Sequence, residues 1–351
     1  MNAKTALLFL LLNAGLAHSF SPKVNGGFKI ESYVSGVANA RSMTLSADGR
    51  WLFVGTRSEG RIYAIEIATK KVLTIAKDLK MPNGVAMRGE DLYVAEVSTI
   101  RVFKNVVKQL PSPTSTVVYN GYPTDTHHGW KHIAFGPDGK LYIPVGAPCN
   151  ICEKSDPYAS LTRLDVDTKK MEVVARGVRN SVGFDWDASG NLWFTDNGRD
   201  YMGDDLPPCE VNRLTKVGEH FGYPYCHGDG IPDTQFGKKA CAAFSKPQLK
   251  LGAHTAPLGL HFYRGTMFPA KYRRGFFVAE HGSWNRSTKA GYRVFFSEVS
   301  SSGRAQAPET LVEGFLEDQR TLGRPVAFAE LPDGSLLISD DDSDQIWRLY
   351  R

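Results

Sequence analysis

Short apolar runs and short polar turns alternate along most of the chain. One pattern recurs six times, in which a polar turn containing glycine is followed directly by a run of leucine, β-branched and aromatic residues. The six copies span residues 45–55, 87–96, 135–143, 187–196, 272–278 and 331–340. Asp-Gly between two apolar runs is typical of a β-hairpin, because both turn residues must tolerate positive φ. Each copy therefore predicts two antiparallel strands.

A further strand is predicted after most of these copies, where the apolar run has an aromatic or β-branched centre. These runs span residues 61–65, 100–103, 161–164, 293–296 and 345–349. Repeats that each supply about four strands are the mark of a β-propeller. Six copies therefore predict an all-β, six-bladed β-propeller. Neither helical periodicity of normal length nor a Gly/Ser linker interrupts the pattern, so we expect a single domain over residues 20–351.

The first residues have the features of a secretory signal peptide. Lys4 precedes an apolar run over residues 6–12, and the small residues Ala17 and Ser19 follow at the spacing of a cleavage site. We expect residues 1–19 to be this peptide. The run is shorter than the roughly 20 residues that cross a bilayer. The sequence thus predicts a secreted or periplasmic protein without stable membrane insertion.

Charge and cysteine content narrow the class further. The formal net charge is +5, with Lys and Arg scattered along the chain, so we expect no nucleic-acid partner. Export permits disulfides. Cys226 and Cys241 flank a loop that a bridge would close, and Cys149 and Cys152 are spaced for a tight second bridge, which leaves Cys209 unpaired.

Polar side chains gather where the predicted strands end, in loops that a rigid scaffold presents to a ligand. The segment 277–286 begins as a strand and ends in a cluster of His, Ser, Trp, Asn and Arg, which is either a site or a turn whose Trp fills a core. His127 and His128 precede the third hairpin. A loop histidine serves as a general base near neutral pH, or simply bonds to the backbone.

Two further sets of residues suggest ligands with opposite charges. Arg179, Arg286 and Arg324 stand in loops between predicted strands, and three converging guanidinium groups would suit a polyanion. The acidic stretch 196–205, with Glu210 soon after, offers the oxygen donors that Ca²⁺ prefers, although such stretches also form simple turns. As an insertion in a propeller, this stretch is expected among long loops on the face that binds the ligand.

Six motifs along the chain resemble the glucose/sorbosone dehydrogenase family, closest to its sorbosone-dehydrogenase-like branch. They occur in order from about residue 41 to 351. The motifs are THHGW at 126–130, ARGVRNSVG at 175–183, WFTDNGRD at 193–200, GDDLPP at 203–208, AEHGSWNR at 279–286 and GRPV at 323–326.

This resemblance implies a six-bladed propeller that binds pyrroloquinoline quinone (PQQ) and Ca²⁺ and oxidises aldoses or related sugar aldehydes such as sorbosone. His128 matches the base that removes the hydroxyl proton while hydride moves to the quinone. The matches to cofactor contacts are Arg179, Asn180, His281, Arg324 and, more loosely, Arg286. The carbonyls of Gly198 and Arg199 match ligands of a calcium that touches PQQ, and Glu210 lies near a second, structural calcium position.

The chain departs from the family at one position. Where the glucose-oxidising branch has a carboxylate that supports the base, Ala147 follows Gly146. Asp125 is one candidate substitute, and a base without a carboxylate orienter is the other. Because no haem-attachment motif is present, the electrons are expected to pass to an external acceptor, a cytochrome or a quinone.

Two other functions remain open from the sequence. One is a calcium-dependent lactone hydrolase of the gluconolactonase-like propeller kind: the stretch Met81-Pro82-Asn83-Gly84-Val85 offers it some support, because such hydrolases place Asn and acidic side chains around an axial metal. A non-catalytic propeller that binds a carbohydrate or a protein is the third hypothesis, because a fold alone does not decide a function.

Overall fold

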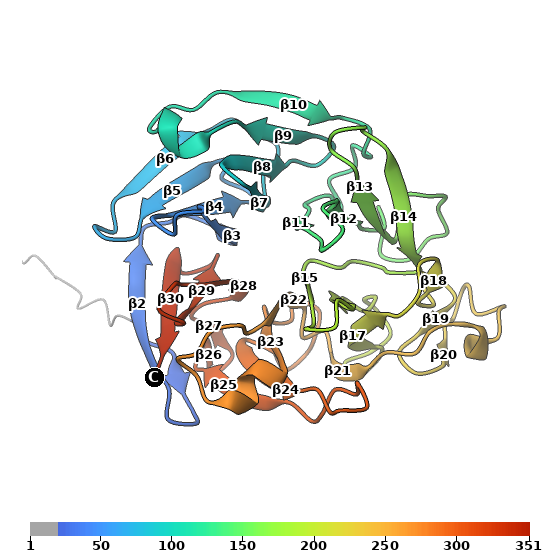
Figure 1. The fold of residues 1–351 in the computed structure, drawn as a ribbon. Helices are drawn as coiled ribbons and strands as arrows, with labels where there is room; N and C mark the ends of the chain where they lie inside the picture. Colours follow the sequence, from blue (N-terminus) through green and yellow to red (C-terminus); the bar gives the residue numbers. More distant parts are fainter. Residues whose placement is uncertain (1–19) are drawn as a thin grey trace, which may run out of the picture.

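The computed structural model describes residues 20–351, so the predicted signal peptide lies outside the described residues. Six antiparallel sheets are arranged as blades around a central axis (Figure 1). This confirms the all-β, six-bladed propeller predicted from the repeats. Within residues 20–351, no helix is long and apolar enough to cross a membrane.

The first three blades follow one another along the chain. The first consists of β3 (Ala40–Leu45), β4 (Trp51–Thr56), β5 (Ile62–Glu66) and β6 (Val72–Ala76). The second consists of β7 (Gly84–Arg88), β8 (Asp91–Ala95), β9 (Ile100–Phe103) and β10 (Ser115–Tyr119), with a short 3₁₀ helix η1 (Val106–Gln109). The third consists of β11 (Ala134–Phe135), β12 (Leu141–Val145), β13 (Ser160–Leu164) and β14 (Met171–Arg176), extended by β18 (Glu219–His220).

The last three blades contain the longer loops. The fourth consists of β15 (Phe184–Trp186), β16 (Leu192–Asp196), β17 (Pro208–Leu214) and β21 (Leu249–Ala253). The fifth consists of β22 (Pro257–Phe262), β23 (Gly275–Glu280), β24 (Arg293–Glu298), β25 (Glu309–Glu313) and the edge strand β1 (Lys23–Val24). The sixth consists of β28 (Pro325–Glu330), β29 (Leu336–Asp340), β30 (Gln345–Tyr350) and β2 (Lys29–Ser35). The remaining elements are the hairpins β19 (Cys226–His227) with β20 (Ile231–Pro232) and β26 (Leu316–Glu317) with β27 (Arg320–Thr321), and the 3₁₀ helices η2 (Cys241–Ala243) and η3 (Ala270–Arg274).

The ring is closed by its N-terminal strand. β2 pairs antiparallel with β30 over the register from Lys29 opposite Tyr350 to Ser35 opposite Gln345. A strand near the start of the described chain and the C-terminal strand thus share the sixth blade, which closes the ring. The hydrophobic core lies between neighbouring blades: Leu52 and Leu337, for example, are fully buried in one cluster between the first and sixth blades.

In five blades the turn of the repeat connects the first and second strands. In the fifth blade the predicted short turn is wrong: residues 263–274, which include η3, connect β22 to β23, and Gly275 begins β23. In the first turn, the Gly49 N–H donates to the Ser46 carbonyl, and Asp48 Oδ1 accepts from the Arg50 N–H at 3.1 Å. Only Gly49 takes a positive φ, of 68°, whereas the sequence pattern predicts a turn with two such residues. The aspartate instead stabilises the turn by accepting a backbone hydrogen bond.

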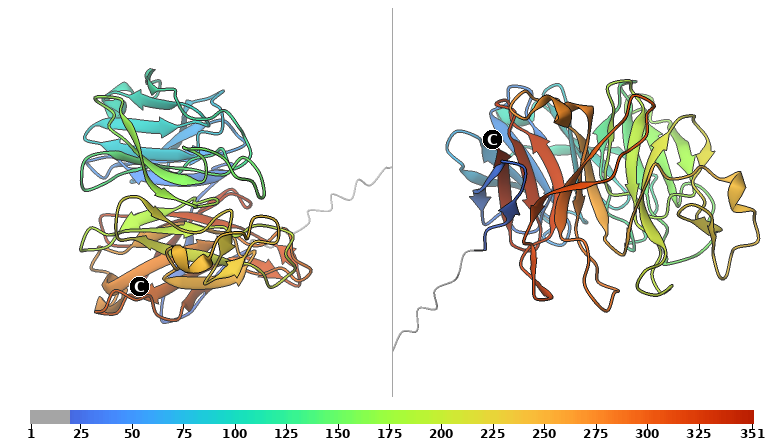
Figure 2. Two further views of the ribbon diagram at one scale, coloured as in Figure 1. Left: turned by 90° about the vertical axis from the view of Figure 1, so that its right-hand side faces the viewer. Right: turned by 90° about the horizontal axis from the view of Figure 1, so that it is seen from below.

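Strand direction explains which segments meet at the axis. Because successive strands of a blade are antiparallel, the start of the first strand and the end of the second lie at the same end of the blade. The glycine-containing turns therefore lie on one face of the ring, and the segments entering the first strand and leaving the second lie on the other. Edge-on views show long loops projecting from one side of the ring (Figure 2).

Both bridges considered from the sequence are present. Cys149 is bonded to Cys152, and Cys226 to Cys241. Among the described residues Cys209 is the one free cysteine, and it is buried.

Candidate functional site

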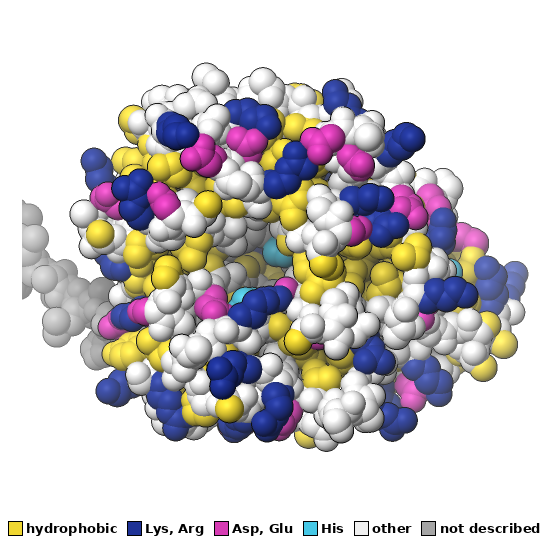
Figure 3. All heavy atoms as spheres, viewed as in Figure 1, with side chains coloured by type: hydrophobic (Ala, Val, Ile, Leu, Met, Phe, Trp, Pro, Cys, Tyr) yellow, Lys and Arg dark blue, Asp and Glu magenta, His cyan; other side chains and the backbone are white. Residues whose placement is uncertain are grey.

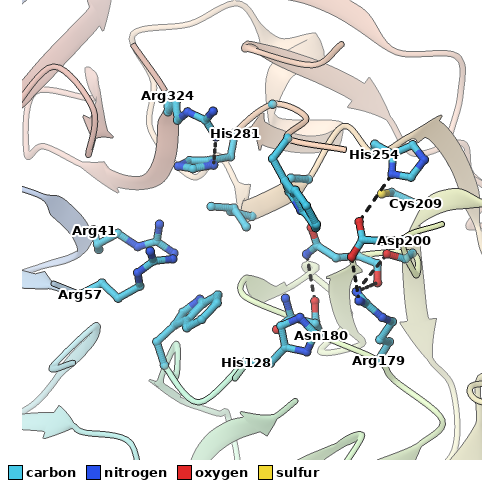
Figure 4. Close-up of a pocket in the computed structure, with 17 residues that line it drawn as sticks. Arg41, Arg57, His128, Arg179, Asn180, Asp200, Cys209, His254, His281 and Arg324 are labelled. Carbon is cyan, nitrogen blue, oxygen red and sulfur yellow. Dashed lines mark hydrogen bonds and ion pairs between the residues drawn. The ribbon is translucent and has the colours of Figure 1, made fainter. Parts of the chain in front are cut away.

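A cavity of about 290 Å³ lies at the axis of the ring. On the face of the molecule drawn in Figure 3, the axis appears as a hollow, and basic and acidic side chains are interspersed around it. The cavity is lined from the ends of the blades opposite the glycine-containing turns. The lining residues labelled in Figure 4 are Arg41, Arg57, His128, Arg179, Asn180, Asp200, Cys209, His254, His281 and Arg324.

The lining is rich in guanidinium groups and poor in carboxylates. Four arginines line the cavity, whereas Asp200 is the one carboxylate among its described lining residues. Arg57 stacks over the ring of Trp130, 4.7 Å from its centroid, and pairs with no carboxylate of residues 20–351. Burial lowers the pKa of Arg57, as do the neighbouring guanidinium groups of Arg41 and Arg324.

The guanidinium of Arg324 is held by neutral partners, and its backbone by a carboxylate. Its backbone N–H donates to Asp340 Oδ1 at 2.8 Å, which fixes the start of β28. Its guanidinium donates to the Tyr292 hydroxyl at 3.1 Å and lies 3.4 Å from His281 Nδ1. Within the described chain it has no carboxylate partner, so its charge is available to a ligand.

One buried carboxylate joins two of the residues that line the cavity. Asp341 accepts from Arg41 Nη1 at 2.7 Å and from His281 Nε2 at 2.8 Å. Since the Nε2 proton of His281 is directed to Asp341, Nδ1 is left to accept from Arg324. Burial favours protonation of Asp341, but His281 and Arg41 outweigh it and hold the pKa of this carboxyl well below its usual range.

His128 has the arrangement of a general base. Its Nδ1 lies 2.8 Å from the Ala147 carbonyl oxygen, to which it can only donate, so Nε2 is left with a free lone pair. This close approach requires Gly146, because a Cβ at that position would lie 2.5 Å from the Cβ of His128. Burial, Arg179 and His127 hold the pKa of His128 well below 6.5, so the imidazole is neutral at physiological pH.

The missing carboxylate is therefore replaced by a backbone carbonyl. Asp125, the substitute considered from the sequence, does not reach the histidine; its carboxylate accepts from the Tyr158 hydroxyl at 2.5 Å. Ala147 thus supports His128 through its backbone carbonyl. A comparison of residue types at position 147 could not detect this hydrogen bond.

Arg179 lines the cavity, but its donors are all used within the protein. Nε and Nη2 bond to the carbonyl and side chain of Asn150, and Nη2 also lies 3.3 Å from Asp200. Nη1 donates to the carbonyls of Asn197 and Gly198 at 3.2 and 3.0 Å. Arg179 is therefore a positioning group for the loop after β16, and the expected contact of its guanidinium with a cofactor is not prepared in this structure.

The hydrogen bonds of Arg179 to backbone carbonyls also affect the calcium site that was expected next to the cofactor. The Gly198 carbonyl, an expected ligand, receives the cationic Arg179 guanidinium, and a second cation at the same oxygen would be repelled. The Arg199 side chain turns away and pairs with Asp233 at 2.6 Å. A calcium ion at the Gly198 carbonyl therefore requires Arg179 to release this oxygen first.

The surroundings of Glu210 fit a cation better. Glu210 and Asp196 are register partners on β17 and β16, are both buried, and line a separate small cavity of about 10 Å³, about the room for one water or ion. Burial and the nearby Asp196 raise the pKa of Glu210 to about 8, and burial raises that of Asp196 to about 6. Two buried carboxylates that disfavour each other's charge are a donor set that a hard cation would stabilise.

Arg286 lies elsewhere than expected. It is not among the cavity-lining residues; its guanidinium pairs with Asp205 at 2.9 Å and also donates to the Asp204 carbonyl. Arg286 thus joins the loop after β23 to the loop after β16. Trp284 of the same segment lines the cavity with 67% of its surface exposed, so the interpretation as a core-filling Trp is wrong.

Asn83, which the hydrolase hypothesis needs at an axial metal, is fully engaged. Its side chain accepts from Arg41 Nε at 2.8 Å and donates to the Lys131 carbonyl at 2.9 Å. In the described part of the chain, no three His, Cys, Asp or Glu side chains are grouped to hold a metal ion. The lactone-hydrolase hypothesis therefore receives no support from this site.

Sequence analysis identified part of this cavity. His128, Arg179, Asn180, His281 and Arg324 are brought together as expected, with Gly198 beside them. Three functional groups were missed: Arg41, Arg57 and Asp341. Two of these follow second strands directly, Arg57 after β4 and Asp341 after β29, which is the position His281 holds after β23. Aligning the six copies by strand end would have found them.

Comparison with known proteins gives both a family and a set of similar folds. A family model described as TrAA12-like matches residues 22–351. An uncharacterized protein of Borreliella burgdorferi is 36% identical over 345 residues, which cover 93% of this chain and 90% of that protein.

Three solved structures illustrate the similarity of this fold to known proteins. The holo form of the PQQ domain of pyranose dehydrogenase from Coprinopsis cinerea has a TM-score of 0.80 at 21% identity, covering 95% of this chain and 98% of that one. A calcium structure of the Trichoderma reesei Carbohydrate-Active Enzymes Family AA12 protein has a TM-score of 0.81 at 18% identity, covering 94% and 97%. The PQQ-bound aldose sugar dehydrogenase from Streptomyces coelicolor has a TM-score of 0.68 at 19% identity, covering 94% and 99%. At these identities the likeness concerns the fold.

Proposed function

Because the chain belongs to the TrAA12-like family, we propose that it is a PQQ-dependent dehydrogenase of an aldose or a related sugar aldehyde such as sorbosone. The observation that supports this most directly is the meeting, in one cavity, of guanidinium groups without carboxylate partners and a neutral histidine with a free Nε2. Two of the similar structures are described as holo and PQQ-bound forms. The electrons would leave to an external acceptor, a cytochrome or a quinone.

The cavity fits a polyanionic cofactor. PQQ carries three carboxylates, and Arg57 of the first blade and Arg324 of the neighbouring sixth blade offer guanidinium groups to such anions. Arg41, oriented by Asp341, adds a further donor, and the side-chain amide of Asn180 has no hydrogen-bond partner among the described residues. When bound, PQQ would supply the acceptor for the hydride that the substrate carbon loses, and with it the two electrons of the oxidation.

His128 would take the proton of the reacting hydroxyl. The Ala147 carbonyl holds the tautomer with its proton on Nδ1, so Nε2 is presented as the acceptor. The low pKa of His128 keeps this nitrogen unprotonated, and Trp130 and Leu258 contribute apolar surface to the same cavity. Cavity walls of this kind position the substrate and the base, while the cofactor supplies the redox chemistry.

We also propose calcium dependence, with Glu210 and Asp196 as carboxylate ligands of a structural ion. A calcium at Gly198 and Arg199 remains a prediction that requires Arg179 to move. Export to a secreted or periplasmic location is part of the proposal, supported by the two disulfides, which persist in oxidising compartments.

The test is a titration of PQQ into the calcium-treated protein, followed by its melting temperature and by dye reduction with glucose, other aldoses and sorbosone. A ligand that binds the native state raises apparent stability by mass action. We expect a saturable rise in melting temperature together with sugar-dependent dye reduction. An unchanged melting temperature would overturn the proposal, and a rise without turnover would leave a non-catalytic quinone-binding propeller.

A further inference from the structure

Two aromatic side chains are exposed together at the mouth of the cavity. Trp284 exposes 67% of its surface and Tyr201 68%, and they are the two aromatic residues among the exposed large hydrophobic side chains of the described chain. Their rings meet edge to face, with centroids 6.1 Å apart and an interplanar angle of 87°. Trp284 lines the cavity, whereas Tyr201 lies outside its lining. The two rings thus form a corner that begins at the cavity and continues beyond it, here called the aromatic rim.

The loop that presents Trp284 is firmly anchored. The Ser283 N–H donates to the Ala290 carbonyl at 2.9 Å, and the Ala290 N–H donates to Ser283 Oγ at 3.0 Å. The Tyr292 hydroxyl donates to the Ser283 carbonyl at 2.7 Å, and Ser283 itself is buried. The residue before Trp284 is therefore fixed on three sides, so exposure of the indole does not result from a loose loop.

The loop that presents Tyr201 is tied to the first one. Arg286 pairs with Asp205 and donates to the Asp204 carbonyl, and the Ser287 N–H donates to Asp204 Oδ1 at 3.1 Å. Tyr201 itself has a φ of 66°, in the left-handed region that bulky residues rarely adopt. Such a conformation persists where surrounding contacts impose it, often at a binding site.

The charges beside the aromatic rim are paired with each other. Because Arg286 forms an ion pair with Asp205, its guanidinium charge is compensated beside the two exposed rings of the rim. Such a surface suits a neutral ligand with an apolar face and a hydroxylated edge, and an aromatic ring binds the apolar face while the polar groups stay in water. A pyranose ring has this chemistry.

Resting on the proposed function, we propose that the aromatic rim is a saccharide subsite for the sugar ring next to the reacting one. The reacting ring enters the cavity beside His128, and Tyr201, outside that cavity, contacts the adjoining ring. The substrate class is then a disaccharide or longer saccharide with a free reacting end, rather than a single sugar.

The experiment compares glucose with cellobiose and maltose as substrates of the full-length, PQQ-loaded protein. Each variant is scored by its ratio of disaccharide to glucose kcat/KM. Trp284→Ala and Tyr201→Ala should each lower this ratio by roughly fivefold to tenfold, the scale of one aromatic stacking contact. Trp284→Phe should retain most of it. Val217→Ala, an exposed apolar residue on the turn after β17, is the matched control and should keep the wild-type ratio.

A ratio unchanged in both alanine variants would overturn the subsite. The subsite would also be overturned if the alanine variants lost only the rate of reduction of a protein acceptor such as cytochrome c. That result would assign the rim to binding of the electron acceptor. Failure of the proposed function is read separately, from the absence of any rise in melting temperature with PQQ. In that case, saturation-transfer NMR with cellobiose on the protein without PQQ tests the rim: loss of cellobiose signal in Trp284→Ala supports it, and equal signal overturns it.

Discussion

Replacing Asp341 by Asn tests the charge network around the cavity. Arg41 exposes 1% of its side chain and Asp341 9%, and their ion pair is 2.7 Å long. Removing one partner of such a pair leaves a buried charge uncompensated and costs about 3–5 kcal/mol. With roughly 2.1 cal/mol/K of unfolding entropy per residue over about 330 residues, this corresponds to a fall of about 4–7 °C in melting temperature.

The assay is thermal melting of the protein without PQQ, with Asp167→Asn as control. Asp167 forms an ion pair of similar length, 2.9 Å, with Arg88, but both side chains are exposed, so its loss should leave the melting temperature almost unchanged. Combining Asp341→Leu with Arg41→Met should recover most of the lost stability, because no unpaired charge remains. A single Asp341→Asn variant as stable as Asp167→Asn would refute the reasoning.

The pH dependence of the Asp341→Asn effect has a defined sign. The pKa of Asp341 is lower in the folded protein than in the unfolded chain, so its ionised form stabilises the fold above about pH 4. This contribution is lost as pH falls through the folded pKa. The difference between wild type and Asp341→Asn should therefore be constant from pH 5 to 8 and shrink below about pH 4. In the presence of PQQ the variant should show the larger rise in melting temperature, because the charge of Arg41 is then available to the anion.

Three further predictions concern the base, the cation site and the anion site. His128→Ala should lower kcat by about 10²–10⁴-fold without changing the PQQ-induced rise in melting temperature, and the wild-type rate should persist below pH 6.5 because the pKa of His128 is depressed. Without calcium, stability should fall as pH rises from about 4.5 to 8, because the pKa of Glu210 is raised to about 8; Glu210→Gln should flatten this slope and abolish a calcium-induced rise in melting temperature. Arg57→Ala should weaken PQQ binding by roughly 10–100-fold in a fluorescence titration, with Arg88→Ala unchanged.

The fold was predictable because its repeat is local. Each glycine-containing turn with its apolar strand marks one blade, and six of them are found. The third strand of the fourth blade, β17, was missed because it carries buried polar residues, Glu210 and Asn212, where an apolar run would be expected. Closure by β2 was also missed, since its pairing with β30 joins opposite ends of the chain and leaves no mark in local sequence.

The site was predictable to the extent that its residues lie in motifs. The family predicted from those motifs is confirmed by the match over residues 22–351. Motifs identify residues such as Arg179 and Arg286 but not the direction of a guanidinium. The Arg179 guanidinium donates to backbone carbonyls such as that of Gly198, and the Arg286 guanidinium donates to the carbonyl of Asp204. The positions of these backbone oxygens cannot be predicted from the sequence.

The Ala147 carbonyl shows how a base can work without a carboxylate partner. Both a carboxylate and a carbonyl accept the Nδ1 proton of His128, so either fixes the tautomer that leaves Nε2 free. A carboxylate would also add a negative charge, which stabilises the protonated imidazole and raises its pKa. A carbonyl adds none, and burial, Arg179 and His127 lower the pKa instead. His128 is therefore a weaker base that stays neutral over a wider pH range. Compared with a carboxylate residue at this position, Ala147 should lower the maximal rate and extend activity toward acid pH. The orientation of the His128 ring should be the same in both cases.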